Sequence, residues 1–82
     1  SAEFELAASY FTAGHDGAAL RHCERALALE TSFEGLKLLG QIAERSGDWR
    51  RARHAWRLAL ATGGDPGQRA LVQALLGTVE PA

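Results

Sequence analysis

The chain has 82 residues, of which 46% are hydrophobic and 23% charged, and its net charge is −1, a balance that excludes a disordered or strongly basic chain. Its single cysteine excludes an internal disulfide framework, and we expect a reducing compartment, the cytoplasm. No apolar run is long enough to cross a bilayer, so no membrane span is expected. Because the chain begins with Ser1 and lacks methionine, we expect residues 1–82 to form a single domain taken from a longer protein.

Charge is distributed unevenly along the sequence. Residues 1–44 carry three basic and seven acidic side chains, a balance of −4, and residues 45–82 carry six basic and three acidic ones, a balance of +3. Such an asymmetry can steer a charged partner or favour head-to-tail association.

Apolar residues with a helical period predict two helices in the first half. The first covers about 2–13, has a core stripe of Leu6, Ala7 and Tyr10, and ends at Gly14. The second covers about 17–30, and its inward residues are Leu20, Cys23, Ala26, Leu27 and Leu29.

The second half predicts three further helices. The third covers about 33–46 between a cap at Thr31–Ser32 and a left-handed Gly47, and it buries Leu36, Leu39, Ile42 and Ala43. The fourth covers 49–62 behind the cap residue Asp48, and its inward residues are Trp49, Ala52, Ala55, Trp56, Ala59 and Leu60. The fifth covers about 66–78 after Asp65–Pro66, and it carries Leu71, Val72, Leu75, Leu76 and Val79. Nothing predicts a strand, so the fold class is all-α.

The two halves repeat each other at a constant offset of 33 residues. The matched positions of the first unit are Leu6–Ala7, Tyr10, Gly14, Ala19, Cys23 and Ala26–Leu27. Those of the second unit are Leu39–Gly40, Ala43, Gly47, Ala52, Trp56 and Ala59–Leu60. A period in the range of about 20–50 residues is typical of stacked helical or strand units, each too small to bury its own apolar face. The repeat therefore predicts an array that binds a partner over an extended surface.

Helix–turn–helix units of this length resemble the tetratricopeptide repeat. The second unit carries the family's pattern at Leu36, Leu39–Gly40, Gly47–Asp48–Trp49, Ala52, Trp56 and Ala59–Leu60. The first unit departs from it at Glu3, Asp16 and Cys23, and both units lack the proline that usually follows the second helix. The resemblance implies two repeats, about 1–31 and 32–63, and a capping helix at about 66–78, stacked as a short right-handed α-solenoid.

In this family the first helix of each unit lines a concave groove that commonly receives a peptide or helix. The resemblance implies groove contacts at Phe4, Phe11, Lys37, Gln41 and Arg45. Two alternatives stay open for the phenylalanines, which are seven residues apart on one stripe. They either anchor a partner or pack against the local core, another copy or an upstream repeat. Lys37 and Gln41 also have the spacing of half a carboxylate clamp, but Ala8 leaves that clamp incomplete.

The fourth helix carries a basic patch. Arg50, Arg53 and Arg57 share a helical face, which suits an acidic partner or a solvated surface. No aromatic side chain is expected among them and the net charge is slightly negative, so nucleic acid is not expected as a partner.

Metal, cofactor and catalytic sites are not expected. His22 and Cys23 are adjacent and point about 100° apart on one helix, so they cannot chelate together. Cys23 lies at a core position and is interpreted as a small buried hydrophobe. The expected function is a non-catalytic protein-binding scaffold. The alternative is a structural or self-associating segment of a longer solenoid or multidomain protein, such as an accessory part of an enzyme, a regulator or a secretion machine.

Overall fold

Five α-helices make up the computed structural model, which describes residues 1–80 and contains no strand within that range. The helices are α1 (Ala2–Thr12), α2 (Asp16–Leu29), α3 (Phe33–Arg45), α4 (Trp49–Thr62) and α5 (Pro66–Val79). The predicted all-α class is confirmed, and every predicted helix boundary lies within one residue of the observed one.

The helix ends follow from local sequence. The side chains of Ser32, Asp48 and Asp65 each accept a hydrogen bond from the backbone N–H three residues ahead, which confirms the three predicted caps. Gly14 and Gly47 have φ of 84° and 83°, the left-handed conformation that ends α1 and α3 and that glycine adopts without strain.

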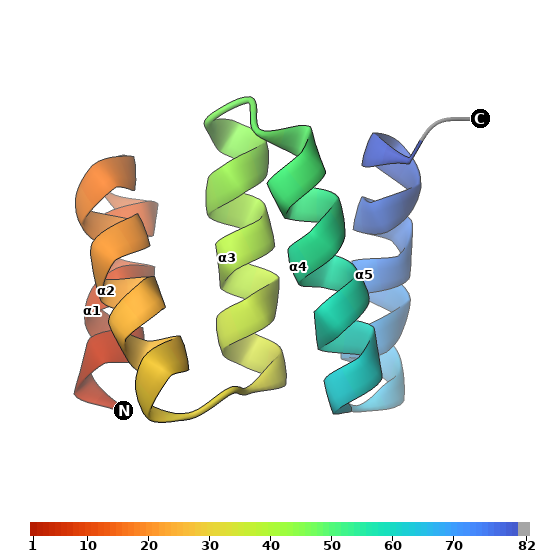
Figure 1. Ribbon diagram of the computed structural model, residues 1–82, viewed down its shortest axis with the longest axis horizontal. Coiled ribbons are helices and arrows are strands. Elements are labelled where there is room, and N and C mark those ends of the chain that lie inside the picture. The colour runs from red at the N-terminus through yellow and green to blue at the C-terminus, as the bar shows by residue number, and fades with distance from the viewer. Residues whose placement is uncertain (81–82) are drawn as a thin grey trace.

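Each helix packs mainly against its neighbours in sequence. The α1–α2 and α3–α4 pairs are the most extensive, and the α2–α3 and α4–α5 contacts join them. Figure 1 shows the α1–α2 pair at one end, α3 in the middle, and α4 with α5 at the other end. The radius of gyration is 11.7 Å, as expected for a compact chain of this length.

The core consists of two apolar clusters that meet at α3 and at Leu27 of α2. The first joins α1 and α2 to one side of α3 through Ala7, Ala19, Cys23, Leu38 and Ile42. The second joins the other side of α3 to α4 and α5 through Phe33, Leu36, Ala43, Ala52, Trp56, Ala59 and Val72. Phe33 and Leu38, which periodicity did not mark as inward, are both buried.

For four residues the predicted inward orientation is wrong. Leu6 and Tyr10 on α1, Leu29 at the end of α2 and Trp49 at the start of α4 are all exposed. On α1 the reason is a rotation of the helix about its axis: Phe4 and Phe11, with Ala7, face the cluster that contains Leu38 and Ile42. Two aromatic rings bury more apolar area there than Leu6 and Tyr10 could.

Candidate functional site

One side of α3 packs against neither core cluster. Leu36 and Ala43 face the α4–α5 cluster and Leu38 and Ile42 face the α1–α2 cluster, so the remaining side is uncovered. That side, called the α3 stripe below, consists of five residues, none of them buried: Glu34, Lys37, Gln41, Glu44 and Arg45.

Arg45 joins one edge of the stripe to α1. Its Nε donates to the two carboxylate oxygens of Asp16 at 2.9 and 3.1 Å, and its Nη2 donates to Asp16 and to the backbone oxygen of Phe11. Its guanidinium carbon lies 3.7 Å from the centroid of the Phe11 ring, a cation–π contact. The hydrogen bonds and charge of Arg45 lower the pKa of Asp16 from its ordinary value of 3.8.

The opposite edge of the stripe reaches α5. Lys37 Nζ donates to Gln68 Oε1 at 2.7 Å, and Thr78 Oγ1 donates to Glu44 Oε2 at 3.4 Å. The first helices of the two units and the fifth helix therefore border one surface, the α1–α3–α5 face.

The structure places the sequence-predicted contacts unequally on this face. Phe4 and Phe11 are half-buried: each packs against the core cluster of α1, α2 and α3, and each keeps part of its ring uncovered. Lys37 and Arg45 have intramolecular partners. Gln41, at the middle of the stripe, makes no side-chain hydrogen bond within residues 1–80 and is the predicted contact that is free to bind.

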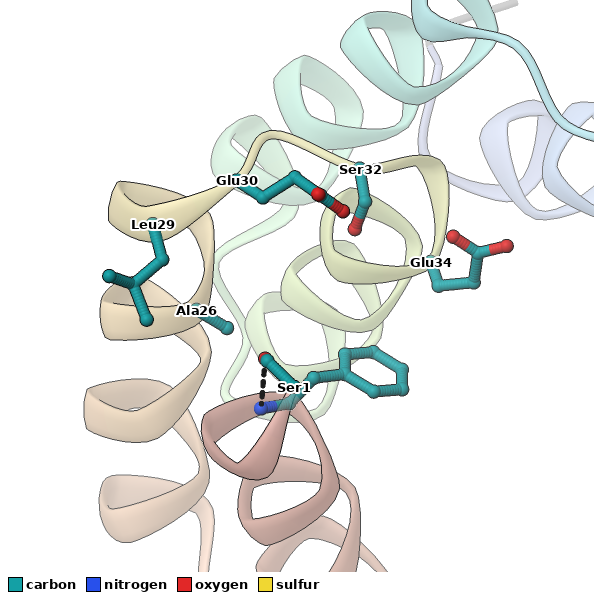
Figure 2. Close-up of a pocket in the computed structure, with 7 residues that line it drawn as sticks. Ser1, Ala26, Leu29, Glu30, Ser32 and Glu34 are labelled. Carbon is teal, nitrogen blue, oxygen red and sulfur yellow. Dashed lines mark hydrogen bonds between the residues drawn. The ribbon is translucent and has the colours of Figure 1, made fainter.

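A pocket of about 480 Å³ opens where α1 begins, α2 ends and α3 begins. Figure 2 shows Glu30 and Ser32 on the connection from α2 to α3, with Glu34 on the first turn of α3. No sequence pattern predicted this pocket, although its two carboxylates belong to the acidic excess of residues 1–44. The lining residues are Ser1, Phe4, Ala26, Leu29, Glu30, Ser32 and Glu34.

The predicted basic patch on α4 divides in two. Arg57 pairs with Glu80 at 2.7 Å, whereas Arg50 and Arg53 lie over the indole of Trp49, with guanidinium carbons 5.3 and 5.1 Å from the ring centroid. Trp49 is 44% exposed. The expectation that no aromatic side chain accompanies these arginines is therefore wrong, because Trp49 was placed in the core.

Net charge also differs between two sets of helices. The helices α2 and α4 together carry six basic and two acidic side chains, a balance of +4, whereas α1, α3 and α5 together carry three basic and four acidic ones.

Cys23 is fully buried and its thiol donates to the backbone oxygen of Gly35 at 3.4 Å. Burial raises the pKa of this thiol to about 11, so it is protonated at neutral pH. Its interpretation as a small buried hydrophobe is confirmed. Across residues 1–80, no group of three or more His, Cys, Asp or Glu side chains is arranged to hold a metal ion.

Within the described part of the chain, no helix combines the length and hydrophobicity needed to span a bilayer. Comparison of the chain with protein-family models, curated proteins and solved structures found no match.

Proposed function

We propose that the chain is a non-catalytic protein-interaction module, similar to tetratricopeptide repeats, that binds a peptide or helix of a partner protein on the α1–α3–α5 face. One observation carries the proposal: the α3 stripe, none of whose five residues is buried, is bordered by α1 on one side and α5 on the other. A bordered, elongated surface suits an elongated ligand.

The composition of the stripe fits a partner with mixed character. Glu34 and Glu44 alternate with Lys37 and Arg45 along it, and Gln41 lies between them. Such a surface offers hydrogen bonds and charges for orienting a ligand, while the uncovered edges of Phe4 and Phe11 add apolar contact.

The architecture that we propose with this function is two helix–turn–helix units and a capping helix in a short right-handed solenoid. The sequential packing of helices, α1 on α2, α2 on α3, α3 on α4 and α4 on α5, supports it. The equivalent burial of Ala19 and Ala52, 33 residues apart, supports it as well. A free, buried thiol at Cys23 suits a reducing compartment.

Gln41 is the position at which to test the proposal. A photo-crosslinking amino acid at 41 should capture a specific polypeptide from the source organism, because this side chain is free at the centre of the face. The matched control is the same amino acid at Gln73, which is exposed on α5 and makes no side-chain hydrogen bond within residues 1–80.

Capture at 41 that is competed by unlabelled wild type but not by a Gln41→Trp variant would support the proposal. The tryptophan fills the face without removing an intramolecular hydrogen bond of residues 1–80. Equal capture at 41 and 73, or competition by Gln41→Trp as strong as that by wild type, would overturn it.

A further inference from the structure

Two surfaces outside the α3 stripe complement each other in chemistry. One is the pocket described above, which combines the apolar side chains of Phe4, Ala26 and Leu29 with the carboxylates of Glu30 and Glu34. The other is the Trp49 cluster, defined as Trp49, Arg50 and Arg53.

The pocket is acidic and apolar at once. Leu29 is 73% exposed, the most exposed large hydrophobic side chain within residues 1–80, so it leaves a large apolar area in water. Glu30 and Glu34 are exposed and take part in none of the ion pairs formed within those residues. A ligand that presents an apolar group beside positive charge would satisfy both features.

The Trp49 cluster has that composition. Its indole is exposed, and two guanidinium groups lie against the ring without a carboxylate partner among the described residues. Tryptophan and arginine are the residue types most enriched among side chains that dominate binding energy at protein interfaces.

The two surfaces lie at opposite ends of the molecule. The pocket is at the α2–α3 connection and the Trp49 cluster follows the α3–α4 connection, and Figure 1 shows these connections at opposite ends of α3. Helix α3 separates them by about 20 Å, so a chain cannot fill its own pocket.

We propose that the pocket of one copy receives the Trp49 cluster of a second copy, with Trp49 against Phe4 and Leu29 and with Arg50 and Arg53 beside Glu30 and Glu34. We choose a second copy as the partner because the acidic, apolar pocket and the basic, aromatic cluster that complements it occur in the same chain.

The contact joins two different surfaces, so every added copy leaves one pocket and one Trp49 cluster unoccupied. Such heterologous association produces open chains unless the rotation between copies closes a ring. Average mass should therefore rise steadily with protein concentration. It should fall at about 1 M salt, where charges are screened beyond about 3 Å.

Sedimentation velocity over a range of concentrations tests the proposal. Trp49→Ala should weaken association at least about tenfold, as expected for a buried aromatic anchor, and the double variants E30R/E34R and R50E/R53E should do the same. The matched charge reversals Glu5→Arg and Arg21→Glu change exposed side chains outside both surfaces and should leave association unchanged.

Mixing E30R/E34R with R50E/R53E provides the decisive experiment. Each variant alone has two like-charged surfaces, whereas the mixture pairs a basic pocket with an acidic cluster and should restore the large species. A wild-type monomer at all concentrations, or a mixture that stays monomeric, would overturn the proposal. Because R50E/R53E leaves the α1–α3–α5 face unchanged, crosslinking at residue 41 in that variant tests the proposed function separately.

Discussion

Gly40 lies on the side of α3 that faces α4, where a Cβ atom would overlap the indole of Trp56. Trp56 is fully buried, and its Nε1 donates to the backbone oxygen of Lys37 at 3.1 Å. Both the surrounding core and this hydrogen bond therefore fix the position of the indole ring. The absence of a side chain at position 40 therefore lets α3 and α4 approach closely. Which side chain fills the space could not be read from a pattern of small and large residues.

Gly40→Ala should destabilise the protein by about 1–3 kcal/mol, because the added methyl group must displace a ring that is already hydrogen-bonded and enclosed. The matched control is Gly77→Ala, since a Cβ at this α5 position meets no atom within 4 Å. That variant should stabilise by about 0.5–1 kcal/mol through helix propensity. Urea unfolding followed by circular dichroism measures both, and equal changes in unfolding free energy would contradict the steric argument.

At the scale of helices, the sequence predicted where each one begins and ends but not how α1 is rotated about its axis. The caps and glycines that set helix ends are local, so Ser32, Asp48 and Gly47 could be identified from their neighbours. Rotation depends on what the helix packs against. Leu38 and Ile42, more than thirty residues from Phe4 in sequence, present the apolar surface that turns Phe4 and Phe11 inward.

Arg45 shows how one side chain holds elements together. It connects the end of α3 to the first residue of α2 and the last turn of α1, through Asp16 and Phe11. The sequence marked Arg45 as a groove residue because it lies on the correct side of α3. Its partners could not be predicted, because the turn between α1 and α2 is brought near only by the packing of the helices.

Arg45→Ala should raise the pKa of Asp16 toward 3.8, because the guanidinium hydrogen bonds and charge that lower it are removed. Because folding lowers the pKa of Asp16, the ion pair stabilises the fold at pH values above the unfolded pKa of this carboxyl group. This stabilisation is lost as the pH falls through the lower pKa of the folded protein. The stability difference between wild type and Arg45→Ala should therefore shrink below about pH 3.8.

A carbon-detected NMR titration of the Asp16 carboxyl group measures this pKa directly. Arg45→Lys is the informative comparison, because it keeps the charge but loses the planar fork that contacts both carboxylate oxygens. It should give an intermediate value. An unchanged Asp16 pKa in Arg45→Ala would show that the pair does not form in solution.

At the scale of the whole molecule, α3 is the element on which the two core clusters meet. The offset of 33 residues makes Glu5 and Ser9 of α1 the counterparts of Leu38 and Ile42, the residues that join the second unit to the first. Because Glu5 and Ser9 are polar and exposed, any element packed on that side of α1 would need different contacts. The repeat in sequence predicted two similar pairs of helices, and the difference between equivalent positions shows where their similarity stops.

The two clusters meet at α3 and at Leu27 of α2, and we expect them to unfold one after the other. Ile42 is 1% exposed and packs with Ala7, Ala19 and Cys23, so Ile42→Ala should cost about 2–5 kcal/mol. Because helices adjacent in sequence make most of the contacts, the loss should fall first on the α1–α2 pair. Hydrogen exchange should then accelerate in α1 and α2, while α4 and α5 keep their protection through the cluster around Trp56.

The control is Leu58→Ala, which also shortens an aliphatic side chain to alanine but at an exposed position of α4, and it should change hydrogen exchange in neither region. Uniform acceleration across all five helices in Ile42→Ala would instead show that residues 1–80 unfold as one cooperative unit.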